Sequence, residues 1–351
     1  MARTGAIPEG LAERLLIRLG LLPTPLLDTL LAVIQARAIL VATRLGIFES
    51  LASGGRTAAD VARVCGTDAR GTEKLLNALV GSSYLRRQRE LYSLRPVARR
   101  WLLAEGGQSL RDNMLYRALE WQAIEHTEEF IRTGKPLNVH EELTPQMWSL
   151  YQRGMRSLAG LSAREVAWRT PVPRGARNLI DIGGAHGYYS VALCRRHRGL
   201  NATVLDLPEA VQHAAPILAK ENMGHQVVHR SGSALTDELG EACWDLALVS
   251  QLVHHFDEET NRALVRRVAK ALRPGGVLAI LELFRPASRG RGGQVGALLD
   301  LFFAVTSESG TWSWQEISDW QRAAGLVPRR VIRLLTMPGV GIQAATKPSV
   351  R

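Results

Sequence analysis

The feature that most constrains this chain is residues 178–187, which read Asn-Leu-Ile-Asp-Ile-Gly-Gly-Ala-His-Gly. The apolar half of this stretch predicts a buried strand, the glycines predict a tight turn, and residues 188–196 predict the helix that follows. Gly183 and Gly187 permit backbone dihedral angles that residues with a Cβ avoid, and they let a bound molecule approach the backbone. Asp181 lies at the carboxyl end of the strand, where open α/β sheets bind their ligands. The stretch therefore predicts a ligand site.

The spacing of the glycines limits which ligand can bind. A dinucleotide fingerprint requires G-x-G-x-x-G, but counted from Gly183 its third and sixth positions are Ala185 and Tyr188. The Gly-Lys-Ser/Thr of a P-loop is also absent. A second apolar strand, residues 202–205, ends in Asp206, and an acid in this place can accept hydrogen bonds from both hydroxyls of a ribose. The pattern favours a nucleoside without a pyrophosphate, with a tight turn that binds no ligand as the alternative.

The composition indicates an ordered protein of two domains. The chain has 351 residues, of which 46% are hydrophobic and 22% are charged. Its formal net charge of +11 raises the question of a nucleic-acid partner, but no long basic run is present, so we interpret the charge as solvated surface arginine. The cysteines, Cys65, Cys194 and Cys243, are far apart and lack C-x-x-C spacing. They predict reduced thiols in a cytoplasmic protein and no metal site.

The N-terminal region shows no signal peptide, because charged residues such as Glu9 and Arg14 break any apolar core there. The most apolar stretch, residues 26–42, is interrupted by Asp28 and Arg37. We interpret it as too short and too polar to span a bilayer. Its leucines recur at helical spacing, which predicts a helix with a wide apolar face against another subunit or domain.

Residues 1–105 are predicted to form an all-α domain with one hairpin. The helices are followed by residues 84–94, which read as two short strands around a polar turn. Three helices and a hairpin make a winged helix, and Arg86, Arg87 and Arg89 would lie on its wing. Such a wing can hold DNA, so this segment alone supports DNA binding and a structural role equally well.

Residues 171–351 alternate strands and helices. After Asp206 the pattern predicts five further strands, at residues 226–229, 244–250, 277–282, 331–335 and 341–345. The last two would form an antiparallel pair that closes the sheet. This alternation predicts an α/β fold, a doubly wound and largely parallel sheet of Rossmann type with helices on both faces. Residues 106–170, between the domains, read as a helical connector with many large side chains.

The glycine turn and Asp206 resemble those of the class I S-adenosylmethionine-dependent methyltransferases. Leu-Gly-Ile-Phe at residues 45–48 and a later Leu-Leu-x-x-Leu resemble the caffeate-type O-methyltransferases and their bacterial relatives, and this resemblance covers residues 26–346. In that family the winged helix is a dimerisation module that does not touch DNA. The resemblance implies S-adenosylmethionine as cofactor, S-adenosylhomocysteine as product, a homodimer formed through the N-terminal domain, a cytoplasmic location, and neither a nucleic-acid nor a membrane partner.

The stretch Ser-Gln-Leu-Val-His-His-Phe-Asp-Glu at residues 250–258 resembles the family's Leu-His-Asp-Trp-x-Asp-Glu, whose histidine is the general base. The match falls on His254. A phenol has a pKa of about 10, so a base that takes its proton accelerates attack on a sulfonium methyl group. Glu282 matches the acid that orients this histidine, as a carboxylate does in other triads. The alternative is that both histidines are structural; His255, which matches an aspartate, is expected to be so.

The resemblance also implies a cofactor site, with departures from the family. The family's Gly-Asp near the adenine is Gly232-Ser233 here, its lysine falls on Ser250, and its tryptophan beside the adenine falls on Phe256. Each departure weakens or replaces one contact. The expected cofactor-binding residues are Asp181, Gly183, Gly184, Gly187, Asp206, Leu207, Ser233, Ser250 and Phe256.

Residues 151–155, Tyr-Gln-Arg-Gly-Met, resemble the Phe-Asn-x-x-Met stretch that lines the family's acceptor pocket. The family's second glutamate beside the histidine aligns with Trp312, which leaves one flanking acid unless Glu308 replaces the other. His126 and His140 match no motif and are expected to be surface or packing residues. We expect a flat aromatic acceptor held by apolar contacts, with core packing as the alternative role of each side chain. The expected acceptor-binding residues are Trp148, Tyr151, Met155, Phe302, Phe303 and Trp312.

Together these features predict an S-adenosylmethionine-dependent O-methyltransferase that acts on a small hydroxylated aromatic compound. Two alternatives stay open. One is a regulator that binds DNA through its winged helix and uses the nucleoside site as a sensor. The other is a fold relative that performs C- or N-methylation, hydroxylation or decarboxylation.

Overall fold

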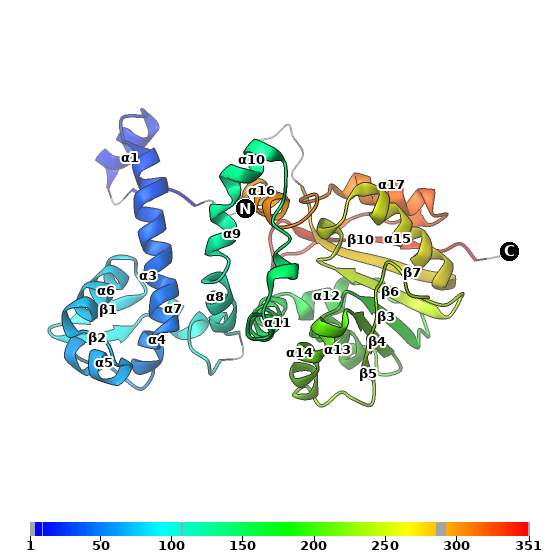
Figure 1. Ribbon diagram of the computed structural model, residues 1–351, viewed down its shortest axis with the longest axis horizontal. Coiled ribbons are helices and arrows are strands. Elements are labelled where there is room, and N and C mark those ends of the chain that lie inside the picture. Colours follow the sequence, from blue (N-terminus) through cyan, green and yellow to red (C-terminus); the bar gives the residue numbers. More distant parts are fainter. Residues whose placement is uncertain (1–3, 9, 107, 286–292, 350–351) are drawn as a thin grey trace. The chain divides into compact units, whose positions relative to one another are not determined.

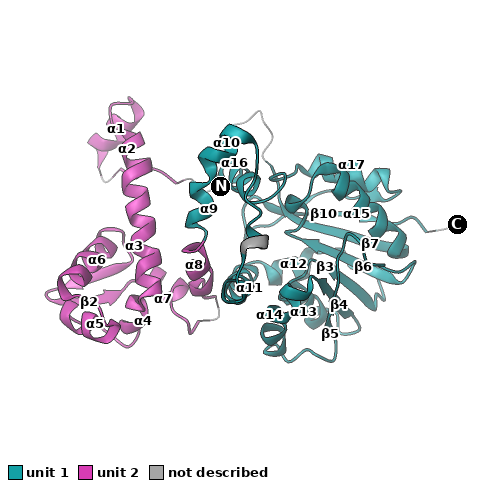
Figure 2. Cartoon of the chain, viewed as in Figure 1, with its two compact units in different colours: residues 1, 120–351 teal, residues 2–119 magenta. Residues whose placement is uncertain are grey.

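The computed structural model describes residues 4–8, 10–106, 108–285 and 293–349. The chain divides into two compact units, residues 2–119 and residues 120–351, which Figure 2 shows in magenta and teal. Each unit has a hydrophobic core of its own.

The N-terminal unit contains the predicted helices and hairpin. Its elements are α1 (Leu11–Arg18), α2 (Thr24–Leu26), η1 (Leu27–Leu31), α3 (Ala32–Arg44), α4 (Ile47–Ser50), α5 (Ala58–Cys65), α6 (Ala69–Gly81), β1 (Leu85–Gln88), β2 (Leu91–Leu94), α7 (Pro96–Trp101) and α8 (Arg111–Arg117). Thr57 accepts a hydrogen bond from the backbone N–H of Asp60, and Asp68 accepts one from that of Gly71. These two side chains therefore cap α5 and α6.

The apolar N-terminal helix is longer than the sequence pattern predicts. The π-helical turn η1 joins α2 to α3, so Thr24–Arg44 is one helix of 21 residues with a mean hydropathy of 1.7. By length and composition alone it could cross a membrane, so the prediction that this stretch is too short was wrong. One such helix is weak evidence of a membrane protein, because core helices of soluble proteins and signal sequences have a similar length and hydropathy. Leu26, Leu30 and Leu31 are about half exposed, so the single chain leaves much of this apolar face uncovered.

The second unit begins with helices that precede its sheet. They are α9 (Trp121–Glu125), α10 (Thr127–Thr133), η2 (Val139–Glu142), α11 (Pro145–Ala159) and α12 (Ala163–Arg169). The longest, α11, starts at Thr144, whose hydroxyl accepts the Met147 N–H, and Pro145 takes the first helical position, where its missing N–H costs nothing.

A mixed sheet forms the centre of this unit (Figure 1). Its strands are β3 (Asn178–Ile182), β4 (Asn201–Asp206), β5 (Val227–Ser231), β6 (Trp244–Ser250), β7 (Leu272–Leu283), β8 (Val327–Pro328), β9 (Ile332–Arg333) and β10 (Val340–Thr346). The strand order is β5-β4-β3-β6-β7-β10-β8, and β9 also pairs with β10. Strands β3 to β7 are parallel, whereas β10 runs antiparallel to β7, which confirms the predicted doubly wound fold. The strand expected at residues 331–335 is only two residues long, since the chain turns back after it into β10.

Helices cover both faces of the sheet because both faces are apolar. They are α13 (Tyr188–Arg196), α14 (Pro208–Ala219), the short η3 (Val253–His255), α15 (Glu258–Ala271), α16 (Gln294–Thr306) and α17 (Trp314–Ala323). Successive strand residues alternate between two core clusters. Leu179 and Leu246 belong to the cluster with residues of α12, α13 and α14, whereas Ile180 and Ala247 belong to the cluster with residues of α15 and α17.

We expect Leu248→Ala in β6 to lower the free energy of unfolding by about 2–5 kcal/mol, since this side chain is completely buried and its loss leaves a cavity. Leu335→Ala is the matched control, because Leu335 is 83% exposed and its loss should change the stability by less than about 0.5 kcal/mol. Urea unfolding followed by circular dichroism measures both values. Equal stability of the two variants would contradict this strand register.

Candidate active site

The candidate site lies at the carboxyl ends of β3, β4, β6 and β7. From β3 the chain builds outward to β4 and β5, and then returns to place β6 on the other side of β3. Open α/β sheets bind ligands at such a reversal of strand order, because the loops on its two sides leave a crevice. The glycine turn, Asp206 and the His254 stretch all follow these strand ends.

The glycine turn depends on backbone conformation and on close packing. Gly183 and Gly187 are left-handed, with φ of +66° and +68°. A Cβ on Gly183 would lie 2.8 Å from the Leu252 side chain, and one on Gly184 would lie 2.5 Å from Cγ of Asp181. The space at these two positions is therefore filled by protein, whereas the sequence argument assigned it to a ligand.

Asp206 is held in place by two backbone N–H groups. The Ala185 N–H donates to Oδ2 at 2.7 Å, and the N–H of the half-exposed Leu207 donates to Oδ1 at 2.8 Å. A carboxylate oxygen can accept two hydrogen bonds, so each oxygen keeps one position for a ligand hydroxyl. Burial raises the pKa of Asp206, and the two backbone hydrogen bonds oppose that rise. The arrangement suits the paired hydroxyls of a ribose.

Asp181 is completely buried. Its Oδ2 accepts the Ser190 hydroxyl at 2.7 Å, whereas Oδ1 has no hydrogen-bond partner in the described part of the chain. Burial is the largest influence on the pKa of Asp181, which is raised to about 7; the Ser190 hydrogen bond lowers it and the nearby Asp206 raises it. A buried carboxyl group with one unsatisfied oxygen fits a cationic ligand group.

His254 and Glu282 form a buried pair. His254 lies in η3, directly after β6, and Glu282 lies near the end of β7. Nδ1 of His254 is 3.0 and 3.1 Å from the two carboxylate oxygens of Glu282, and the Leu283 N–H donates to Oε1 at 2.8 Å. The two side chains are 4% and 0% exposed. A carboxylate at Nδ1 keeps the proton on that nitrogen, so Nε2, which no described residue hydrogen-bonds, is left as an acceptor.

The backbone around His254 is fixed from inside the core. The buried Asn261 amide donates to the carbonyls of Val253 and Phe256, at 2.8 and 2.9 Å. The indole N–H of Trp312 also donates to the Val253 carbonyl, at 3.0 Å, and the Trp312 ring belongs to the core cluster under the sheet. Trp312, expected in the acceptor wall, therefore supports η3 by packing and hydrogen bonding.

The remaining expected cofactor residues follow the same strand ends. Ser250 is buried at the end of β6, and Ser233, after β5, accepts the Leu235 N–H at 3.2 Å. Phe256 packs against the core directly after η3. Their contacts with a cofactor stay predictions.

Aromatic rings lie beside His254. Phe303 of α16 stacks on the His254 ring with centroids 4.0 Å apart, and Phe302 meets Phe303 edge-on at 5.6 Å. Trp148 and Tyr151 of α11 are in edge contact at 5.7 Å. Four of the expected acceptor residues therefore form two aromatic pairs, one of them directly against the candidate base.

His140 connects these two pairs. Its ring, in η2, lies 5.8 Å from Trp148, 5.2 Å from Tyr151 and 4.8 Å from His255, which in turn lies 4.2 Å from His254. Burial, followed by the neighbouring His254, lowers the pKa of His140 to about 4. His140 is thus a packing residue, as one half of the sequence expectation had it, but no motif marks its location beside His255.

His186, inside the glycine turn, links that turn to α11. Its Nδ1 accepts the Tyr188 N–H at 3.1 Å, and the ring also hydrogen-bonds the backbone of Met155. Burial and then the charge of Arg156 lower the pKa of His186 to about 3, so the ring is neutral. Met155, expected in the acceptor wall, is thus held through its backbone. Sequence reasoning missed His186 and Asn261. Asn261 lies three residues before Leu264, on the buried face of α15, which is a usable signal, whereas His186 lies among glycines and no such pattern marks it.

Within the described residues His254 has one carboxylate partner, Glu282. Glu308, considered as a substitute for the family's second acid, is exposed to solvent. The described chain also contains no group of three histidine, cysteine, aspartate or glutamate side chains placed to hold a metal ion. The orientation of His254 therefore depends on Glu282.

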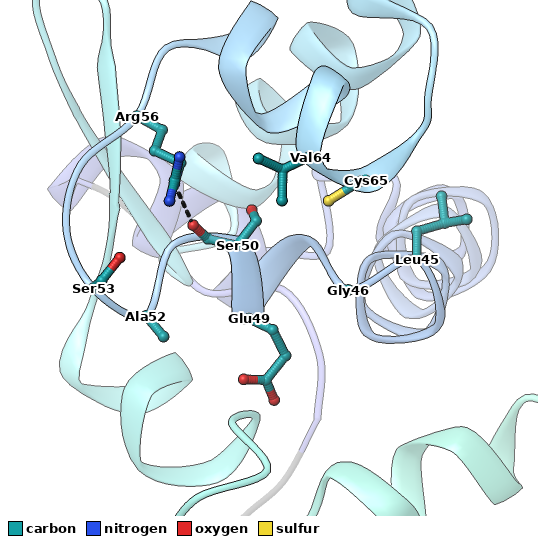
Figure 3. A pocket seen from close by; sticks show the side chains of 9 residues that line it. All are labelled: Leu45, Gly46, Glu49, Ser50, Ala52, Ser53, Arg56, Val64 and Cys65. Atoms are coloured by element: carbon teal, nitrogen blue, oxygen red, sulfur yellow. Dashed lines mark hydrogen bonds between the residues drawn. The ribbon is translucent and has the colours of Figure 1, made fainter.

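The N-terminal unit contains a separate hollow of about 510 Å³ (Figure 3). Glu49, Arg56 and Cys65 are among the residues that line it. Arg56 donates to the Ser50 carbonyl at 2.6 Å, and Glu49 accepts the Ala104 N–H at 2.5 Å. These charged groups hold the unit's own backbone, and the hollow contains none of the expected site residues.

Comparison with known proteins covers both units. Residues 123–326 match the O-methyltransferase domain, and residues 27–104 match the O-methyltransferase dimerisation domain. One relative, 3-hydroxy-5-methyl-1-naphthoate 3-O-methyltransferase of Streptomyces sahachiroi, is 27% identical over 336 residues, which cover 93% of this chain and 95% of the relative. Another, the N,N-dimethyltransferase OxyT of Streptomyces rimosus, is 26% identical over 260 residues, or 71% of this chain and 75% of the relative.

Among solved structures, human N-acetylserotonin methyltransferase in complex with S-adenosylmethionine has a TM-score of 0.82 at 20% identity, with 98% of this chain and 100% of that chain covered. This similarity shows a shared fold, an α/β sheet preceded by a dimerisation domain. The domain match at residues 123–326 spans more than half of the sequence. The chain therefore belongs to the O-methyltransferase family, whose methyl donor is S-adenosylmethionine.

Proposed function

We propose that this chain forms a homodimer and methylates a hydroxyl group of a small, flat aromatic acceptor, with His254 as the general base. The observation that carries the proposal is the buried His254–Glu282 pair, whose free Nε2 lies at the same edge of the sheet as Asp206. The dimerisation-domain match and the uncovered apolar helix Thr24–Arg44 support the homodimer. We place the enzyme in the cytoplasm, with neither nucleic acid nor a membrane as a partner.

The residues at the strand ends fit S-adenosylmethionine. Asp206 would hold the ribose, since each of its oxygens keeps one free acceptor position. Asp181 would lie near the ammonium group, because its Oδ1 lacks a partner in the described chain. When bound, the cofactor supplies a methyl group on a positively charged sulfur. The other residues that we propose to line it are Gly183, Gly184, Gly187, Leu207, Ser233, Ser250 and Phe256.

His254 would accept the acceptor's hydroxyl proton at Nε2. Glu282 keeps the Nδ1 proton in place and fixes the direction of the ring, so the basic lone pair points away from the carboxylate. The Phe303 ring stacks on the His254 ring, with the two centroids 4.0 Å apart. It would cover one face of the imidazole and shield it from water. A site with little water favours a reaction in which opposite charges are neutralised.

Planar side chains would hold the acceptor. Trp148, Tyr151, Phe302 and Phe303 offer aromatic faces and edges beside His254, and such rings pack well on a flat aromatic compound. The relative from Streptomyces sahachiroi acts, by its name, on a hydroxynaphthoate, which is an acceptor of this kind. We keep Met155 as a wall residue, one helical turn after Tyr151.

N-methylation is the second candidate function, since one relative is named as an N,N-dimethyltransferase. A neutral amine already has a free lone pair, so it needs no base to attack the methyl group. His254 would then be dispensable for the reaction.

Asp206→Ala should weaken S-adenosylmethionine binding by roughly tenfold to a hundredfold, because two hydrogen bonds to a carboxylate are lost. Isothermal titration calorimetry gives the dissociation constants. Asp319→Ala, on the exposed surface of α17, is the matched control and should bind like the wild type. Failure of the wild type to bind the cofactor would refute the proposed function.

His254→Ala should lower kcat by roughly 10²–10⁴-fold, the usual contribution of a general base, while cofactor binding persists. Glu282→Gln, which keeps a hydrogen bond to Nδ1 but loses the charge, should lower kcat less. Initial rates with radiolabelled cofactor and hydroxynaphthalene acceptors measure both effects. The exposed His225→Ala is the control. Undiminished turnover by His254→Ala would exclude the base role and favour N-methylation.

The raised pKa of Asp181 predicts a stability that depends on pH. The native protein keeps this proton up to pH about 7, whereas an unfolded aspartate loses it near pH 4. The native state therefore binds more protons between these values, and its stability falls as the pH rises through them. Asp181→Asn should remove this fall. Thermal unfolding of the wild type and of Asp181→Asn without cofactor, near pH 5 and near pH 8, measures this difference. The same pH dependence of stability in the two proteins would contradict the raised pKa of Asp181.

A further inference from the structure

The imidazole of His140 has no hydrogen-bond partner in the described part of the chain. Its ring contacts are those with Trp148, Tyr151 and His255. An imidazole that no described residue hydrogen-bonds, beside a candidate active site, can bind a ligand that supplies its hydrogen-bond partners.

His255 stands between His140 and the candidate base. The distances between ring centroids are 4.8 Å from His140 to His255 and 4.2 Å from His255 to His254. Nδ1 of His255 lies 2.9 Å from the Ser307 hydroxyl, which fixes the ring, and no described residue hydrogen-bonds its Nε2. Three imidazoles therefore form a row that starts at the base.

His140 and His255 are both neutral at physiological pH. Burial, together with the neighbouring histidines, lowers the pKa of His140 to about 4 and that of His255 well below its ordinary value. A neutral imidazole carries one N–H donor and one nitrogen acceptor. Such groups suit a hydroxyl or carbonyl oxygen, whereas binding a carboxylate would require one ring to take up a proton.

We propose that His140 and His255 hold a second, uncharged oxygen substituent of the aromatic acceptor, next to the hydroxyl that His254 deprotonates. Rings 4–5 Å apart can reach oxygens on neighbouring carbons of one aromatic ring. This inference rests on the proposed function and deepens it, since it names the acceptor class as aromatic compounds with two adjacent oxygen groups. His140 and His255 are then residues that determine specificity.

Two probes of the same size and shape test the inference: 2-naphthol, with one hydroxyl, and 2,3-dihydroxynaphthalene, with two. Calorimetry measures their affinities for protein saturated with S-adenosylhomocysteine. The wild type should bind the diol at least about tenfold more tightly, the usual effect of one additional hydrogen bond in a dry site.

Variants at His140 separate hydrogen bonding from packing. His140→Phe keeps a ring but removes both polar atoms, and it should lower the ratio of the two affinities severalfold, since only His255 then remains to hold the second oxygen. His140→Gln keeps one donor and one acceptor, so it should retain most of the preference. The exposed His225→Phe, made as the matched control, should leave the ratio as in the wild type.

The outcomes distinguish this inference from the proposed function. If the wild type does not bind S-adenosylhomocysteine, the proposed function itself is refuted. If the product binds but the wild type does not prefer the diol, or binds neither probe, only the inference is overturned. It is also overturned if His140→Phe keeps the preference or if His140→Gln loses it as completely as His140→Phe does.

Discussion

The second unit is built around one buried carboxylate, that of Glu282. An acid without solvent must be paired and hydrogen-bonded, because its charged form is otherwise strongly disfavoured. His254 and the Leu283 N–H supply these partners, so the end of β7 and the helix η3 must keep a fixed distance. On the next strand, Gly341 pairs with Glu282, and a Cβ there would lie 2.6 Å from the Phe284 ring. The His254–Glu282 pair and the tight contact between β7 and β10 therefore lie at the same end of β7.

A second set of contacts joins the glycine turn to α11. His186 bonds the Tyr188 N–H on one side and the Met155 backbone on the other. Arg156 lies over the Tyr188 ring at 3.2 Å and is paired with Glu221 at 2.6 Å. Because α11 also carries Tyr151, the aromatic wall and the glycine turn belong to one packed assembly. Movement of either segment would therefore disturb the other.

Much of this arrangement could be predicted from local patterns. The strand and turn at residues 178–187 and the alternation after Asp206 indicated the sheet, and a resemblance to a known motif pointed to His254 and Glu282. His140 could not be found this way, since its neighbours come from α11 and η3 and the short helix η2 shows no periodicity. Trp312 was assigned by alignment alone, which says nothing about the direction of a side chain. The length of the apolar helix was underestimated at its ends, because the helix runs from Thr24 to Arg44, beyond the apolar residues 26–42 on which the prediction was based.

The position of β10 has a consequence for how the protein is made. β7 lies between β6, which precedes it in the chain, and β10, which follows only after α16 and α17. During synthesis one edge of an apolar strand therefore stays unpaired until β10 emerges, and open strand edges are sites of association between chains. Pairing across so long a separation is also slow to form. The strand that carries Glu282 is thus among the last parts of the sheet to be closed, and the nascent chain exposes an apolar strand edge until β10 has paired with it.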